Sequence, residues 1–161
     1  METTDNKDNT CCPLVDVQNW DDIIHDWESK HFIKSKVRTF LYMPLNFGKV
    51  ITELDKKIRG AGAICQDSLC LSDHTSRWNM NIYLAVDKEI SGADNVSLSG
   101  SYYSKVYEGP FSKTAEWCRD YREAASRRAL NTGKMYMWYT TCPACAKKYG
   151  KNYVVIISKI E

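Results

Sequence analysis

The chain has 161 residues, 43% of them hydrophobic and 26% charged, which is the balance of one globular domain with a single core. A net charge of +2 gives no general electrostatic case for a nucleic-acid partner, and we expect none. No apolar run approaches the roughly 20 residues that cross a membrane, so no membrane partner is expected either. Ten Tyr and five Trp are many for this length, and they suit the walls of a small-molecule pocket as well as a core.

Residues 1–10 are polar and charged without periodicity, which predicts a disordered tail and no secretory signal. Seven cysteines without such a signal indicate reduced thiols, and the odd count excludes complete intramolecular pairing. We therefore expect a cytoplasmic protein that is a monomer or homodimer. Residues 11–36 are interpreted as an amino-terminal arm, and residues 37–161 as one ligand-binding domain.

The arm carries apolar residues at helical spacing. Trp20, Ile23, Ile24 and Trp27 follow the pattern i, i+3, i+4, i+7, which predicts one face of a short helix packed on the domain.

Residues 37–86 predict the order β-α-β-β. A strand over 37–45 precedes a helix over 48–60 with Ile51, Leu54 and Ile58 on its buried stripe. Strands over 68–73 and 79–86 follow. In the second of these Met80, Ile82 and Leu84 alternate with polar residues and should pack under the helices. Asn81 and Tyr83 would then face the opposite side, where we expect a cleft.

The same order returns over residues 96–160. A long strand over 96–107 leads to a helix from an amino-terminal cap at Ser112 to about Leu130, followed by strands over 135–141 and 153–160. The buried stripe of this helix should contain Cys118, Tyr121 and Ala125. We predict an α+β fold in which two β-α-β-β repeats form an antiparallel sheet, with two helices on one face and a ligand cleft.

The segment Lys105–Phe111, which ends in Gly-Pro-Phe before the second helix, resembles the GyrI-like (SOUL-related) small-molecule-binding family. The segments Pro44–Val50 and Tyr139–Tyr153 are similar to those of stand-alone members labelled hydrolases. The resemblance implies a protein that detoxifies reactive aromatic compounds, because some relatives open cyclopropane rings in DNA-alkylating natural products by adding water. Drug-binding members usually carry a Glu near the start of the last strand, but here the residues are Lys151–Val154, so the binding of cationic drugs is not expected. The chain also has no helix-turn-helix half, which argues against a transcription regulator.

Cys142-Pro143-Ala144-Cys145 has three interpretations. A redox pair is disfavoured because only 16 residues follow Cys145, too few for the rest of a glutaredoxin fold. Cys142 and Cys145 could instead be half of a structural zinc site that Cys11 and Cys12 complete from the arm. The third interpretation is that they are small packing thiols in a turn. No cofactor other than this zinc ion is expected.

Glu108 is the favoured catalytic acid or base, because it lies where a strand meets the Gly-Pro turn, near helical N–H donors. A solvated turn carboxylate is the alternative, and Asp73 and Asp87 are weaker candidates. Tyr139 is the second residue assigned to catalysis. The three histidines are scattered and give no support to a Ser-His-Asp hydrolase.

We expect aromatic side chains of the protein to bind an aromatic ligand by stacking on its rings. The residues assigned to binding are Asn81, Tyr83, Tyr103, Tyr107, Trp138 and Tyr149, although any single aromatic is more often core than ligand contact. Residues 135–139 leave open which alternate set faces the cleft. The favoured function is a small-molecule hydrolase; the alternatives are a binding or sequestering domain and a metal-stapled interaction module.

Overall fold

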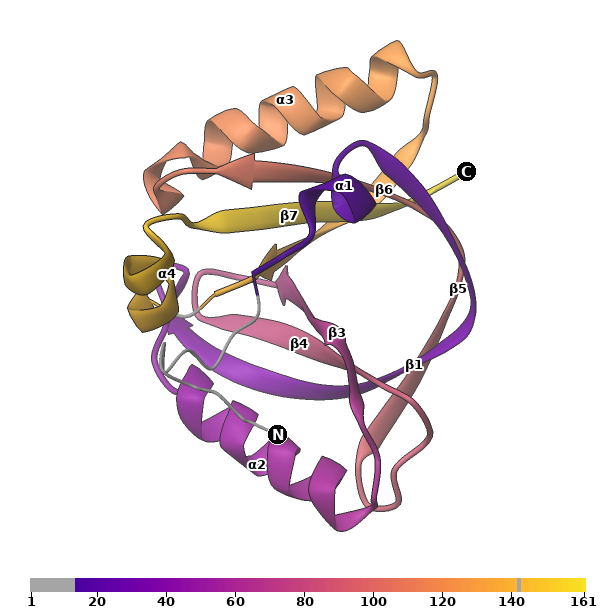
Figure 1. Ribbon diagram of the computed structural model, residues 1–161, viewed down its shortest axis with the longest axis vertical. Helices are drawn as coiled ribbons and strands as arrows, with labels where there is room; N and C mark the ends of the chain where they lie inside the picture. The colour runs from indigo at the N-terminus through magenta and orange to yellow at the C-terminus, as the bar shows by residue number, and fades with distance from the viewer. Residues whose placement is uncertain (1–13, 142) are drawn as a thin grey trace, which may run out of the picture.

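One strongly curved antiparallel sheet forms the body of the protein. Its order is β2-β1-β4-β3-β6-β7-β5, and β1 also pairs with β5, so six long strands close into a barrel (Figure 1). The computed structural model describes residues 14–141 and 143–161. The predicted tail of residues 1–10, together with Cys11, Cys12 and Cys142, lies outside the described residues.

The predicted helix over Trp20–Trp27 is wrong. A short helix α1 spans Val17–Trp20, Asp22 takes a positive φ of 59°, and strand β1 then runs from Ile23 to Phe40. Half-buried and exposed residues alternate from Ile23 to Glu28, which is the period of a strand: Ile23 and Trp27 share the half-buried face, whereas Ile24 lies on the exposed one. Most of the expected arm is therefore part of the barrel wall.

The first half of the chain follows the predicted order. After β2 (Met43–Pro44), α2 spans Phe47–Gly60, β3 spans Cys65–His74 and β4 spans Asn79–Val86. Val50, Leu54 and Ile58 of α2 pack against the outer face of β1 and β4, where Met80, Ile82 and Leu84 are buried. The expected packing of this β4 face under a helix is confirmed; Ile51, expected on the buried stripe, is only partly buried.

The second half comprises β5 (Asp94–Glu108), α3 (Thr114–Arg127), β6 (Thr132–Tyr139), α4 (Pro143–Tyr149) and β7 (Tyr153–Ile160). Ser112 is not the cap of α3, because it lies inside a 3₁₀ turn over Phe111–Lys113 that precedes the helix. The helix ends at Arg127, three residues before the predicted end at Leu130. The short helix α4 was not predicted.

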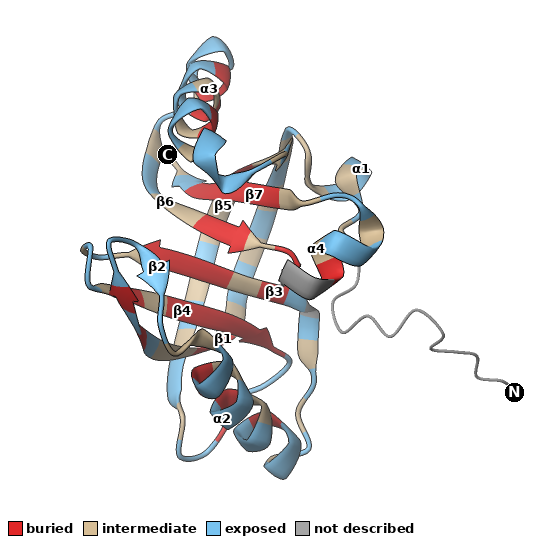
Figure 2. Ribbon diagram, turned by 90° about the vertical axis from the view of Figure 1, so that its left-hand side faces the viewer, coloured by how far each residue is buried: buried red, intermediate tan, exposed pale blue. Residues whose placement is uncertain are grey.

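Helices α2 and α3 both pack on the outside of the barrel, at opposite ends of the view in Figure 2. A separate core fills the interior with large side chains, among them Phe32, Leu71, Tyr102, Trp138 and Ile157. The predicted α+β class is confirmed. Within the described part of the chain, no helix is long and apolar enough to cross a membrane.

Candidate functional site

The curvature of the sheet sorts the predicted ligand residues onto two faces. Tyr83 of β4 and Trp138 of β6 belong to the interior core, and Asn81 lies on the same face of β4 as Tyr83. Tyr136 packs beside Tyr83, with ring centroids 5.8 Å apart. The interior set of β6 is therefore Lys134, Tyr136 and Trp138, which resolves the alternation that the sequence left open.

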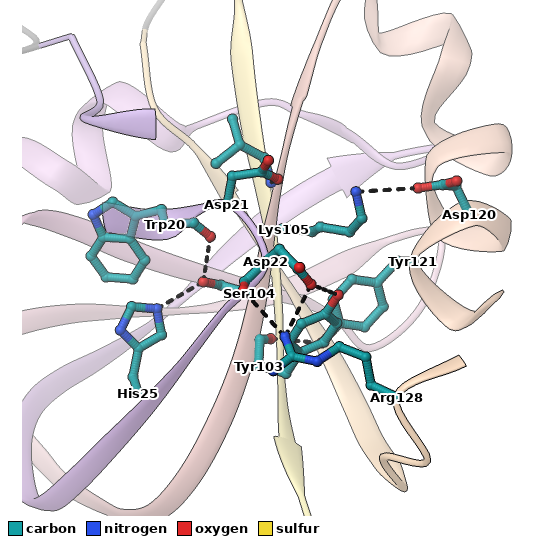
Figure 3. Close-up of polar contacts among 11 residues, drawn as sticks. Trp20, Asp21, Asp22, His25, Tyr103, Ser104, Lys105, Asp120, Tyr121 and Arg128 are labelled. Atoms are coloured by element: carbon teal, nitrogen blue, oxygen red, sulfur yellow. Dashed lines mark hydrogen bonds and ion pairs between the residues drawn. The ribbon is translucent and has the colours of Figure 1, made fainter. Parts of the chain in front are cut away.

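Tyr103 and Tyr107 do not join this interior set, and their expected place in the cleft is corrected. Both pack under α3 on the outer face, and their hydroxyls donate to the carboxylates of Asp22 at 2.6 Å and Asp120 at 2.7 Å. Figure 3 shows that the Asp22 carboxylate is the shared acceptor, since the Arg128 guanidinium also donates to it at 3.0 Å. These side chains hold α3 and the turn after α1 on the barrel.

The two residues assigned to catalysis lie on strands separated by β7. Glu108 is exposed at the end of β5, opposite Tyr153. Tyr139 is opposite Val154 and its hydroxyl is 3.0 Å from Nε2 of His74. Burial raises the pKa of Tyr139 to about 12. Tyr149 is half-buried on α4. Assigning catalysis to Glu108 and Tyr139 stays a prediction.

The cysteine motif lies partly outside the described residues. Cys145 is buried in α4, 2% exposed. Among the residues that the structure describes, no three His, Cys, Asp or Glu side chains gather closely enough to hold a metal ion. Because Cys11, Cys12 and Cys142 are not described, the zinc site stays a prediction.

An ion pair between a buried carboxylate and a half-exposed lysine lies on the interior face where β3 meets β6. The Asp73 side chain is only 8% exposed, and its Oδ2 accepts a hydrogen bond from Lys134 Nζ at 3.0 Å. This hydrogen bond raises the pKa of Lys134. β3 and β6 share a single ladder position, Ser72 opposite Met137, so the Asp73–Lys134 pair also joins the two halves of the barrel. A carboxylate this buried is unusual unless it is paired.

A cavity of about 420 Å³ opens beside this pair, within the usual size range of small-molecule sites. It is lined by Leu98, Tyr102, Asn131, Thr132, Gly133, Lys134, Tyr136, Lys159 and Glu161. We call the cavity, together with Asp73 and Tyr83 behind it, the barrel mouth. An aromatic wall, two lysines and a buried carboxylate are thus assembled from β3, β4, β5, β6 and β7.

Residues 1–160 match the model of a family described as bacterial hydrolase. The chain belongs to the bacterial hydrolase family. No curated protein matches the chain.

Solved structures share the fold of this bacterial hydrolase family member. A hydrolase from Listeria innocua is 12% identical, with a TM-score of 0.62 over 86% of this chain and 91% of its own. The EcmrR C-terminal domain is 9% identical, with a TM-score of 0.60 over 89% of this chain and 98% of its own. EcmrR has also been solved in complex with DNA, in a longer chain of which 56% is covered. At such identities the likeness concerns the fold alone, and the expected absence of a nucleic-acid partner stays a prediction.

The tyrosine hydroxyls of the barrel mouth have no hydrogen-bond partner among the described residues. Within residues 14–141 and 143–161, no hydrogen bond is made by the hydroxyl of Tyr83, Tyr102 or Tyr136. Burial raises the pKa of Tyr102 and Tyr136, so both hydroxyls stay protonated at neutral pH and can donate to a bound molecule.

A Ser-His contact in this family member is structural. The Ser104 hydroxyl is 2.7 Å from His25 Nε2, but it donates to the carbonyl of Trp20 at 2.6 Å and Ser104 is 0% exposed (Figure 3). A serine without access to substrate cannot act as a nucleophile. This Ser-His contact therefore supplies no nucleophile, and the expectation that the protein is not a Ser-His-Asp hydrolase stays a prediction.

Sequence reasoning passed over Lys134, Tyr102 and Lys159. The signal for Lys134 was present, because strand alternation places it on the face of Tyr136 and Trp138. Lys159 and Tyr102 are opposite each other in the β5–β7 ladder, a pairing that alternation within one strand does not reveal.

Proposed function

We propose that this chain is a small-molecule hydrolase whose reaction takes place in the barrel mouth, with the Asp73 carboxylate as the base. The observation that carries the proposal is a buried carboxylate, 3.0 Å from Lys134, beside a cavity walled by tyrosines. Glu108, the candidate from the sequence, is exposed and lies outside this cavity. Membership of a family described as bacterial hydrolase supports the reaction class.

The chemistry follows from the charges. Lys134 binds one oxygen of Asp73 and leaves the other free to accept a proton from a water molecule as its oxygen attacks an electrophilic carbon. The electrons of the bond that breaks pass into a conjugated carbonyl of the substrate. The oxygen of that carbonyl then takes a proton from the Tyr136 hydroxyl. The sum is substrate plus one water, and the proton held by Asp73 returns to Tyr136 through solvent.

The resemblance to GyrI-like proteins suggests the substrate class, a reactive aromatic compound such as one bearing a strained cyclopropane. The element order β1-α2-β3-β4 followed by β5-α3-β6-β7 supports a duplicated ligand-binding fold of that kind. In this proposal Tyr83, Tyr102 and Tyr136 stack on the ring system and Asp73 directs water at the strained carbon. The proposed setting is the cytoplasm, where such a protein would intercept alkylating compounds.

Asp73→Asn tests this assignment, with Glu108→Gln as the matched control. Each protein is incubated with a cyclopropane-bearing aromatic alkylator and the water adduct is followed by mass spectrometry. We expect Asp73→Asn to lower kcat about 10²- to 10⁴-fold, as for loss of a general base, while Glu108→Gln stays within about twofold. Full activity of Asp73→Asn in a protein of unchanged melting temperature would contradict the proposal.

A second function, binding without turnover, is favoured by one observation. Asp73 and Lys134 already neutralise each other, an arrangement that holds a ligand pocket in shape without any chemistry. Wild-type protein that gains thermal stability from the alkylator, yet forms no adduct above the uncatalysed rate, would select this function.

A further inference from the structure

We infer that the ligand of the barrel mouth is an aromatic anion, bound by Lys159 through its carboxylate or sulfonate and by the tyrosines through its rings. This inference rests on the proposed small-molecule site and names the class of ligand that the site takes. Three independent features of the described residues support it. Lys159 has no acidic partner, lysines already lie over the rings of Tyr83 and Tyr136, and Asp73 already binds Lys134.

Lys159 is the free lysine. Its side chain lines the cavity directly opposite Tyr102, and in the described part of the chain no acidic group lies within 4.0 Å of its ammonium. Its stem crosses β5 over Gly100, where an added Cβ would come within 2.7 Å of Lys159 Cε. Gly100 also has a φ of 123°, a conformation that other residues rarely adopt. The backbone is therefore shaped to let this lysine lie along the wall of the cavity.

Two tyrosine rings of the barrel mouth, Tyr136 and Tyr83, already carry a cation. Lys134 Nζ lies 5.9 Å from the ring centroid of Tyr136, and Lys34 Nζ lies 5.9 Å from that of Tyr83. Cation–π binding uses these positions, so a second cation there would be repelled. A ring of neutral or negative charge can still pack against the edges of both tyrosines in an edge-to-face arrangement.

The buried acid is also occupied, because Asp73 accepts its hydrogen bond from Lys134. The charged groups that face the cavity or lie directly behind it are Lys34, Lys134 and Lys159 against Asp73 and Glu161. Glu161 is the one acid of the lining and is not within 4.0 Å of either lining lysine. Among the described residues, Lys159 is therefore the lining lysine that has no acidic group within 4.0 Å.

Three naphthalene probes of equal shape test the sign of the charge: 2-naphthoate, 2-naphthamide and 2-naphthylmethylammonium. Binding is measured by quenching of tryptophan fluorescence, since Trp138 and Trp27 lie in the interior core, and checked by calorimetry. We expect 2-naphthoate to bind about tenfold more tightly than the amide, with the ammonium weakest, and the preference to shrink as salt rises. Lys159→Met should remove the preference for the anion. Lys57→Met, an exposed lysine on α2, should leave it unchanged.

Tighter binding of the ammonium than of the naphthoate would overturn the inference, as would an anion preference that survives Lys159→Met. Binding of the three probes with equal affinity would also overturn it, while the loss of turnover in Asp73→Asn would still stand and keep the proposed function. If none of the probes binds and Asp73→Asn is fully active, both the inference and the proposed function fail.

Discussion

The outer face under α3 and the barrel mouth are both rich in tyrosine, yet they use it differently. Under α3 the hydroxyls of Tyr103, Tyr107 and Tyr121 each donate to a protein oxygen at 2.6–2.7 Å. In the mouth the hydroxyls of Tyr83, Tyr102 and Tyr136 make no hydrogen bond to any described residue. A hydroxyl that is committed to the protein stabilises the fold, whereas one that faces a cavity is available to a ligand.

The same contrast holds for charge. Under α3, Asp22 and Asp120 each have a basic neighbour, Arg128 at 3.0 Å and Lys105 at 3.7 Å. In the mouth, Lys159 has no acidic partner within reach among the described residues. Aromatic content alone therefore does not distinguish the two regions. What distinguishes them is the number of hydroxyl and charged groups that have no hydrogen-bond or ion-pair partner among the described residues.

The largest expected effect is on the α3 face. Tyr121 is 0% exposed and its hydroxyl donates to the Tyr103 carbonyl, so Tyr121→Ala leaves both a cavity and an unpaired acceptor. We expect the free energy of unfolding to fall by about 3–5 kcal/mol. Chemical denaturation measures this, with the exposed Leu45→Ala as the control that stays within about 0.5 kcal/mol. A loss below about 1 kcal/mol for Tyr121→Ala would break the distinction between the two regions.

Removing one hydroxyl oxygen from a tyrosine in each region tests the difference between the α3 face and the barrel mouth more finely. Tyr103→Phe removes a hydrogen bond to a carboxylate and should cost about 1–2 kcal/mol of stability, less than a fully buried bond because Asp22 is half-exposed. Tyr136→Phe removes a hydroxyl without a protein partner and should change stability by less than about 0.5 kcal/mol. Its effect should appear in ligand binding or turnover instead. Equal melting temperatures for the two variants would contradict this view.

The smallest effect is one of pH. The hydrogen bond from Tyr103, and then Arg128, hold the pKa of Asp22 below its ordinary value of 3.8. A group with a lowered folded-state pKa contributes stability that is present above the unfolded pKa and is lost as pH falls through the folded one. We therefore expect Asp22→Asn to be less stable than wild type by under about 1 kcal/mol at pH 6, since the pair is exposed. In thermal melts at stepped pH, the difference should begin to shrink as the pH falls below 3.8 and should vanish once the pH is below the lowered folded-state pKa. A difference that persists at pH 2 would show that the contact is not electrostatic.

Much of the fold could be predicted from local pattern. The strand over 79–86 alternates so regularly that its bounds and its buried face are confirmed, and the helix over 48–60 begins only one residue early, at Phe47. Errors arose where tertiary pairing overrides local spacing. Trp20 to Trp27 fits a helix by period, but pairing with β5 holds Ile23 to Trp27 extended.

The candidate site was harder to predict, for a physical reason. Tyr102 and Tyr103 are adjacent in β5, so their side chains point to opposite faces of the sheet. Tyr103 lies under α3 and Tyr102 faces the cavity, and the sequence alone does not show which of the two faces is the interior one. The sequence makes Asp73 a weaker candidate than Glu108 because it predicts that a loop begins there, whereas Asp73 lies in β3 and contacts Lys134, a partner 61 positions away. Only the closed sheet brings these groups together.

Closure of the ring has a consequence for how the chain folds. Residues 23–34 pair with residues 94–104. The barrel therefore closes only when two segments that are far apart in the chain have met. Such topologies fold in milliseconds to seconds rather than microseconds. Until β5 arrives, the outer edge of β1 is an unpaired strand that invites association with other chains. The bulge between Trp27 and Lys30, with Ser29 at a φ of 50°, interrupts that edge, and Lys30 and Lys34 place positive charge along it. We therefore expect the irregular stretch of β1 to hinder edge-to-edge association before the barrel has formed.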